Sequence, residues 1–171
     1  MSLKNQYWDS SVFVAYFNDE AGRADTVENL LNEGTEGKLT VVTSAFACVE
    51  VLKLKEHEHL SQGNEEMISD LFQYPFIKIV DATRSVCEAA RHLIWKHPSL
   101  KPKDAVHLAS ALAYAQREYL DVLFSYDKDF LNLDGQITQK FHIKEPYIDE
   151  PPLFKESRER AIETTSPQDL L

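Results

Sequence analysis

The stretch LKPKDAVHLASALAYAQREYLDVLFSYDKDF, residues 100–130, contains a long helical pattern followed by a short apolar run. Pro102 suits the first turn of a helix, and alanines recur through residues 103–118, which predicts a helix that packs closely against a sheet. Residues 122–125 have the length and composition of a buried strand. A helix that leads directly into such a strand is part of a βαβ unit, so this stretch indicates a parallel sheet.

The rest of the chain repeats this alternation of short apolar runs and longer helical patterns. The other strands are expected at residues 5–9, 39–43 and 76–80, with a weaker candidate at 140–144. The other helices are expected at residues 11–17, 24–32, 45–60, 65–73 and 84–96. The pattern therefore predicts an α/β fold built around a parallel sheet.

Local signals mark several of these boundaries. Ser44 is expected to cap the helix that begins at residue 45, and Thr83 is expected to cap the helix that begins at residue 84. Gly34 and Gly37 are expected to bracket a loop, and the Gln-Gly-Asn sequence at 62–64 is expected to separate the two helices of a hairpin.

The chain of 171 residues is long enough for one hydrophobic core, and its composition is that of an ordinary globular protein. We expect one domain over residues 1–149 and a polar tail over 150–171, where a Pro-Pro pair precedes a charged stretch without an apolar face. Cys48 and Cys87 lack the spacing of a zinc or redox site, so they are expected to be buried thiols in a reducing cytoplasm. We expect neither a signal peptide nor a membrane-spanning segment, because no apolar run has the required length.

The formal net charge of −10 argues against broad electrostatic attraction to nucleic acid, which normally uses clustered lysine and arginine side chains. An excess of acid is compatible with carboxylates gathered around metal ions, and with the binding of a basic protein partner.

Two acidic residues stand inside or directly beside apolar segments in the first third of the chain. Glu50 is the only charged residue between positions 41 and 52, and a buried carboxylate is costly unless it is protonated, hydrogen-bonded or paired with a cation. The alternative places Glu50 on the polar edge of its helix, bonded to Lys53 or Lys55. Asp9 ends the first expected strand, where ligand sites lie in open parallel sheets, and it is also suited to cap the following helix.

Two further acids occupy comparable positions near the end of the apolar pattern. Asp104 begins the helix of residues 103–118, where it also complements the helix dipole. Asp127 follows the strand of residues 122–125, and it and Asp129 are also suited to a turn or a cap. His107 lies one helical turn after Asp104 and is within reach of the same region, but we expect it mainly to anchor its helix.

All four acids are expected to face the same end of one parallel sheet. Clustered carboxylates repel one another unless a cation joins them, and Mg²⁺ and Mn²⁺ prefer such oxygen ligands. The sequence therefore predicts one acidic pocket that binds Mg²⁺ or Mn²⁺ and is formed by Asp9, Glu50, Asp104 and Asp127.

Four sequence segments, taken in this order, resemble the motifs of the PIN-domain family. They are WDSSVFVAYF around Asp9, TSAFACVEVLK around Glu50, LKPKDAVHLASALAYA around Asp104 and FSYDKDF around Asp127. The resemblance implies a three-layer α/β/α sandwich with a central parallel sheet. It also implies a nuclease site in which these four acids hold one or two Mg²⁺ or Mn²⁺ ions, with Asp129 as an auxiliary ligand.

The same resemblance implies roles for residues beside the acids. Ser10 and Ser125 match hydroxyl positions next to the first and last acid, and both are expected to bind the substrate together with Lys103, a candidate for binding its phosphate. Lys53, Lys55, Lys101 and Lys128 also flank the motifs, although exposed lysines are usually only solvated. Many small prokaryotic members resemble VapC-type toxins, which cleave RNA until a basic antitoxin protein occupies the groove, and they commonly form homodimers.

Our main hypothesis is a Mg²⁺- or Mn²⁺-dependent endoribonuclease that cleaves single-stranded RNA in the cytoplasm, as the toxin of a toxin–antitoxin pair. The alternative keeps the PIN-like fold but makes the protein a catalytically inactive interaction module for a basic protein partner. A phosphatase-like enzyme with an Asp nucleophile ranks lowest, because that chemistry usually needs a second acid two residues after the first, where this chain has Ser11.

Overall fold

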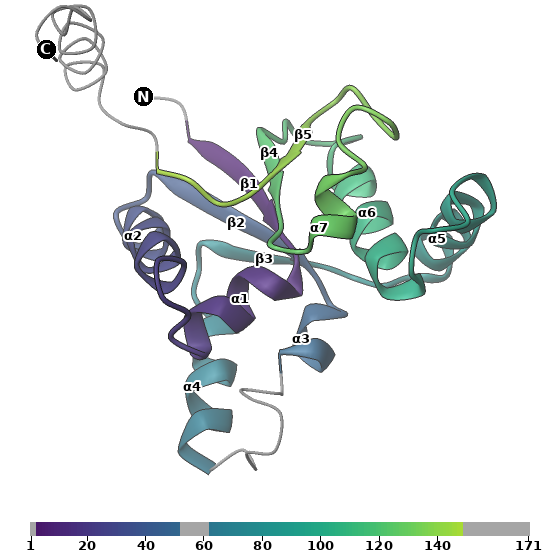
Figure 1. Ribbon diagram of the computed structural model, residues 1–171. Coiled ribbons are helices and arrows are strands. Elements are labelled where there is room, and N and C mark those ends of the chain that lie inside the picture. The colour runs from purple at the N-terminus through teal and green to yellow at the C-terminus, as the bar shows by residue number, and fades with distance from the viewer. Residues whose placement is uncertain (1–2, 52–61, 149–171) are drawn as a thin grey trace, which may run out of the picture.

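The computed structural model describes residues 3–51 and 62–148, and Figure 1 shows how their helices and strands are arranged. The strands are β1 (Lys4–Trp8), β2 (Leu39–Ser44), β3 (Ile77–Val80), β4 (Val122–Phe124) and β5 (His142–Lys144). The helices are α1 (Ser10–Phe17), α2 (Ala24–Thr35), α3 (Ala47–Glu50), α4 (Gln62–Phe72), α5 (Arg84–Lys96), α6 (Pro102–Tyr114) and α7 (Lys128–Leu131). Every expected strand is confirmed, including the weak candidate that becomes β5.

The five strands form one sheet in the order β3-β2-β1-β4-β5, and each neighbouring pair is parallel. The chain adds β2 and β3 on one side of β1, and then β4 and β5 on the other side. The strand order therefore reverses at β1. In open parallel sheets, ligands bind beyond the carboxyl ends of the strands at such a point.

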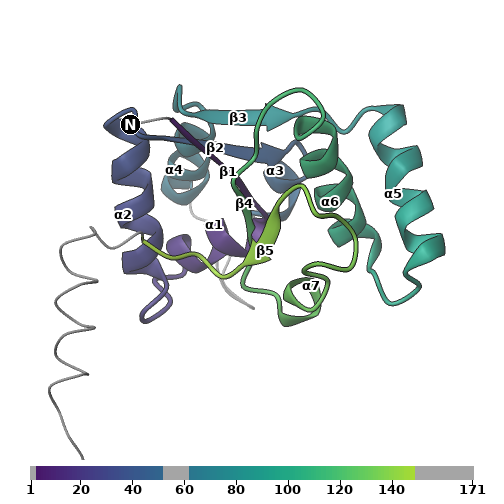
Figure 2. The same ribbon diagram turned by 90° about the horizontal axis from the view of Figure 1, so that it is seen from above.

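The sheet is covered on both faces, because successive side chains of a strand point to opposite sides. Trp8 packs with apolar residues of α1, α2 and α4, and its neighbour Tyr7 packs with residues of α5, α6 and α7. Figures 1 and 2 show these two groups of helices on opposite faces of the sheet. The three-layer α/β/α sandwich is confirmed.

Three of the helix starts have the local causes that the sequence indicated. The Asp9 carboxylate accepts a hydrogen bond from the backbone N–H of Ser11 at 2.9 Å and caps α1. The Thr83 hydroxyl accepts one from the N–H of Val86 at 3.4 Å and caps α5, while Pro102 occupies the first turn of α6.

The helix expected at residues 45–60 differs in the part that the structure describes. Only Ala47–Glu50 are helical, because Val51 leaves the helix with a ψ of 35°, and residues 52–60 lie outside the described residues. Ser44 belongs to β2. Its hydroxyl accepts a hydrogen bond from the N–H of Phe46 at 3.2 Å, so it forms the turn before α3 and is not the N-cap.

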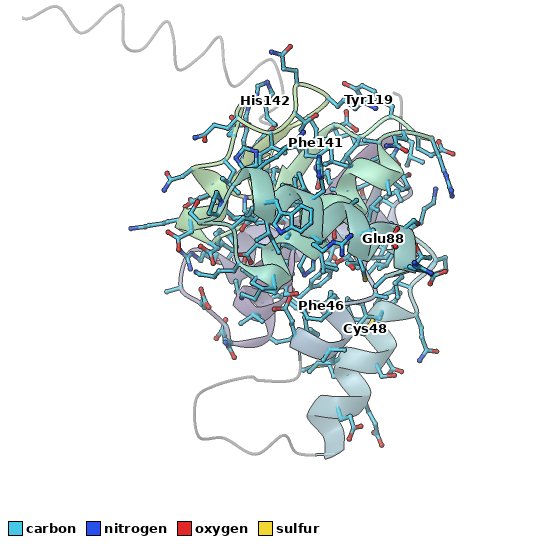
Figure 3. All side chains as sticks on the ribbon, turned by 90° about the vertical axis from the view of Figure 1, so that its right-hand side faces the viewer. Phe46, Cys48, Glu88, Tyr119, Phe141 and His142 are labelled. Carbon is cyan, nitrogen blue, oxygen red and sulfur yellow. The ribbon has the colours of Figure 1, made fainter. Side chains whose placement is uncertain are left out.

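Three other local expectations need correction. Gly34 lies inside α2 and does not open a loop, and residues 62–64 form the start of α4 and do not interrupt a helix. Cys48 and Cys87 are exposed, not buried. Ala47 on α3, and Val86 and Ala90 on α5, face the core and turn the neighbouring cysteines outward; Figure 3 labels Cys48 on the short helix α3.

The expected boundary between a domain and a tail at residue 149 falls at the edge of the described residues, so the tail over 150–171 stays a prediction. Across residues 3–51 and 62–148, no helix combines the length and the apolar character that crossing a membrane requires.

Replacing Gly34 by alanine is expected to destabilise the protein by about 1–2 kcal/mol. A Cβ atom at this position would clash with the ring of Phe76, and such overpacking outweighs the gain of about 1 kcal/mol in helix propensity. The measurement is urea unfolding followed by circular dichroism. Asn32→Ala, on the exposed side of the same helix, is the matched control and should be neutral; equal stability of both variants would contradict the prediction.

Candidate active site

The carboxyl ends of the two central strands place acidic residues on either side of the point where the strand order reverses. Asp9 follows β1, and Asp127 lies three residues after the end of β4. Glu50 ends α3, which follows β2, and Asp104 stands in the first turn of α6. All four line one cavity of about 230 Å³ together with Ser10, Ser11, Lys103 and His107. We call it the acidic cavity.

The Asp9 carboxylate is held on both of its oxygens. Oδ1 accepts hydrogen bonds from the backbone N–H and the hydroxyl of Ser11, at 2.9 and 2.5 Å, and Oδ2 accepts one from the hydroxyl of Ser125 at 2.6 Å. Burial raises the pKa of Asp9, and the charge of His107 and these hydrogen bonds oppose the rise. These hydrogen bonds therefore fix the orientation of the Asp9 carboxylate and partly stabilise its negative charge.

Glu50 is held by three side chains that surround its carboxylate. Oε2 accepts hydrogen bonds from the hydroxyl of Ser10 at 2.5 Å and from Nε2 of His107 at 2.9 Å, and Oε1 lies 3.6 Å from Nζ of Lys103. Burial pushes the pKa of Glu50 up, but the hydrogen bonds from His107 and Ser10 and the charges of His107 and Lys103 together outweigh it, so the pKa lies below its ordinary value. Glu50 is thereby kept ionised.

His107 links the acidic cavity to the core. The side chain is 2% exposed, and its Nδ1 lies 3.0 Å from the hydroxyl of Tyr7. Since Nε2 faces the Glu50 carboxylate, which only accepts hydrogen bonds, Nε2 carries a proton and donates a hydrogen bond to Glu50. His107 therefore anchors α6, as expected, and also donates a hydrogen bond to Glu50. The spacing of residues along the chain does not reveal this second role.

Asp104 has the least compensated carboxylate of the four. It is 6% exposed, and its pKa is raised from 3.8 to about 6. Burial is the largest cause; the charges of Asp127 and Asp9 add to it, and Lys103 and Lys101 oppose it. Near neutral pH the acidic cavity thus holds a carboxylate that lacks a matching positive charge.

Two of the expected site residues lie outside the acidic cavity. Ser125 is fully buried and donates its hydrogen bond to Asp9 from behind, so it positions that carboxylate and cannot touch a substrate. Asp129 lines a neighbouring cavity and forms an ion pair with Lys101 at 3.0 Å. Its N–H donates to Asp127 at 2.8 Å, so Asp127 also caps α7. Lys53 and Lys55 lie outside the described residues.

The residues of the acidic cavity fit a divalent cation by their chemistry. Carboxylate oxygens are the ligands that Mg²⁺ and Mn²⁺ prefer, and a cation would offset the repulsion that raises the pKa of Asp104. In the described part of the chain, no three His, Cys, Asp or Glu side chains are already grouped closely enough to hold a metal ion. The carboxylates of the acidic cavity would therefore have to come closer together to share one ion.

A comparison with protein families gives one match, to the family model described as PIN domain, over residues 7–136. The chain belongs to the PIN domain family. The matched segment contains all four acids of the cavity as well as His107, the end of β1 and the strands β2 to β4. No curated protein matches this PIN domain in sequence.

Several solved structures share the fold of this chain. VapC20 of Mycobacterium tuberculosis, described as a sarcin–ricin loop cleaving toxin, aligns with a TM-score of 0.58 and 18% identity over 73% of this chain and 92% of its own. VapBC2 of Rickettsia felis, solved with a DNA fragment from its promoter, aligns with a TM-score of 0.58 and 12% identity over 82% and 98%. A toxin–antitoxin complex from Klebsiella pneumoniae aligns with a TM-score of 0.55 and 19% identity over 84% and 99%.

Proposed function

We propose that this PIN domain is a Mg²⁺- or Mn²⁺-dependent endoribonuclease that cleaves single-stranded RNA. The observation that carries the proposal is the convergence of Asp9, Glu50, Asp104 and Asp127 on one cavity at the carboxyl ends of the central strands. When bound there, a divalent ion supplies the Lewis-acid chemistry of phosphodiester hydrolysis. A stable fold alone does not need four acids in one small cavity, since clustered carboxylates repel one another.

The protein's own residues have distinct roles in this proposal. Ser11 and Ser125 orient the Asp9 carboxylate, and His107 and Ser10 keep Glu50 ionised and aimed into the acidic cavity. Asp127 and Asp104 complete the set of oxygen donors. Lys103 lines the same cavity with an exposed side chain, so its ammonium group can attract the substrate phosphate.

We also infer that this ribonuclease is the toxin of a toxin–antitoxin pair. One of its structural relatives, from Klebsiella pneumoniae, was solved as a toxin–antitoxin complex, and another, VapC20 of Mycobacterium tuberculosis, is described as a toxin. The net charge of −10 suits a small basic antitoxin as partner. We also propose that the protein forms a homodimer and acts in the cytoplasm. Co-expression with a small basic protein encoded beside this chain should suppress the cleavage and yield a stable complex on gel filtration.

Chelation is expected to stop RNA cleavage, and added metal is expected to restore it. The assay uses the purified full chain, an end-labelled single-stranded RNA, and Mg²⁺ or Mn²⁺ with and without excess EDTA. Asp9→Asn, purified in the same way, controls for contaminating ribonucleases. Cleavage that persists in EDTA, or in the Asp9→Asn preparation, would overturn the proposal.

The alternative, a catalytically inactive module that binds a basic protein, is separated from the enzyme by titration calorimetry with Mn²⁺. A binding isotherm that is lost in Asp9→Asn supports the metal site. No heat of binding, together with no cleavage at any metal concentration, favours the interaction module.

A further inference from the structure

A second cavity lies beside the acidic cavity and shares one wall with it. It has a volume of about 320 Å³, and Asp104 lines both cavities. Asp129, which the sequence suggested as an auxiliary metal ligand, lines only the second one. An RNA strand bound in the acidic cavity can therefore extend into the second cavity past the side chain of Asp104.

The second cavity combines an apolar floor with polar groups at its rim. Leu100 and Leu133 are 5% and 8% exposed and supply the floor. Ser99, Asn132 and Gln136 supply hydroxyl and amide groups at the rim, and all three are exposed. Cavities in this size range with an apolar lining and a few convergent polar groups are the usual form of small-ligand sites.

The polar groups of the rim are available to a ligand. Within residues 3–51 and 62–148, neither the Ser99 hydroxyl nor the Asn132 side-chain amide has a hydrogen-bond partner. Gln136 donates one amide hydrogen to the backbone oxygen of Asn132 at 2.6 Å, which leaves its side-chain oxygen as an acceptor. Asp129 uses Oδ2 for Lys101, which leaves Oδ1 as an acceptor.

We propose that the second cavity is a base pocket, which takes the nucleobase next to the cleaved phosphate and prefers a base with an exocyclic amino group. This inference rests on the proposed ribonuclease function. A phosphate is disfavoured in the base pocket, because the carboxylates of Asp104 and Asp129 line it. A base is planar and uncharged, so it can pack on Leu100 and Leu133 while its edge faces the rim.

The preference for an amino group follows from the excess of acceptors. Carboxylates only accept hydrogen bonds, and the side-chain oxygens of Asn132 and Gln136 add two more acceptors. Adenine, cytosine and guanine each present an exocyclic amino group to such acceptors. Uracil presents carbonyl oxygens that would face the Asp104 and Asp129 carboxylates. A site lined by acceptors favours a ligand that donates, because an acceptor placed against these oxygens is repelled and forms no hydrogen bond.

The test measures both cleavage and binding of short single-stranded RNAs that differ only in base, such as hexamers of A, C or U. In the wild type, kcat/KM and affinity are expected to be at least about 10-fold higher for A or C than for U. The double variant Asn132→Ala with Gln136→Ala should lose this preference, mainly through a higher KM for the A and C hexamers. Binding is followed by fluorescence anisotropy in EDTA, where no cleavage interferes.

The controls separate this inference from the ribonuclease proposal. Gln139→Ala removes an exposed amide outside the base pocket and should keep the wild-type preference, and Ser99→Trp should block the pocket by bulk. If the double variant cleaves with the wild-type preference, or the wild type cleaves and binds all hexamers equally, the base pocket is refuted and the ribonuclease stands. If nothing cleaves, the ribonuclease proposal fails, and a base preference in binding that the double variant loses still supports the pocket.

Discussion

Asp104→Asn is expected to reduce metal-dependent RNA cleavage by at least about 100-fold. The substitution keeps the shape of the side chain but removes the negative charge of a buried carboxylate that lines the acidic cavity. A 100-fold loss corresponds to about 2.7 kcal/mol of transition-state stabilisation, within the several kcal/mol that a metal site supplies to such a reaction. The measurement is kcat/KM on the end-labelled RNA at pH 7 with saturating Mn²⁺.

The same substitution is expected to stabilise the metal-free protein at neutral pH. Because the pKa of Asp104 is raised from 3.8 to about 6, the folded state binds this proton more tightly than the unfolded state does. The penalty is absent below pH 4, grows as the pH rises, and is complete above pH 6. After allowance for solvent screening, Asp104→Asn should add about 1–2 kcal/mol to the free energy of unfolding at pH 7 in EDTA, and almost nothing at pH 4.

Asp81→Asn is the matched control for both measurements, because Asp81 is exposed and lies outside the acidic cavity. It should change neither kcat/KM nor the pH dependence of stability. If Asp104→Asn retained most of its activity, Asp104 would not belong to the catalytic set. If it lowered stability equally at pH 4 and pH 7, the carboxylate would be held by favourable contacts and not by repulsion.

Replacing His107 by leucine is expected to destabilise the protein by about 2–3 kcal/mol and to lower cleavage at least about 10-fold. Leucine removes one hydrogen-bond partner from the buried hydroxyl of Tyr7 and a hydrogen-bond donor from Glu50. The activity falls because Glu50 loses both its orientation and part of the support for its charge. Urea unfolding and kcat/KM at matched folded fraction measure the two effects separately.

A double-mutant cycle and a conservative variant test the two causes. Tyr7→Phe removes the hydroxyl that contacts His107, so the double variant should cost less than the sum of the single costs. His107→Gln keeps an amide donor that can reach Glu50, and it should recover part of the cleavage without recovering all of the stability. Additive costs and no recovery of cleavage by glutamine would rule out this linkage.

Much of the fold could be predicted because its signals are local. Short apolar runs and longer helical patterns alternate clearly enough to place all five strands, and Asp9, Thr83 and Pro102 begin their helices through contacts or backbone angles within a few residues. The length predicted for helix α3 is too great in the described residues, because an apolar run does not reveal where the backbone turns. The exposure of Cys48 and Cys87 was missed because a neighbour one position away can face the core while the cysteine faces outward.

The amino-acid sequence alone determined the α/β class, the parallel sheet and the identity of the four acids, since apolar spacing and strand-end positions are properties of the chain itself. Only the tertiary structure decided how these acids are held. Ser125 lies 116 positions from Asp9, and His107 lies 57 from Glu50, so no local pattern could pair them. Burial and hydrogen bonding depend on which segments meet in space. They explain why the pKa of Glu50 is lowered while the pKa of Asp104 is raised.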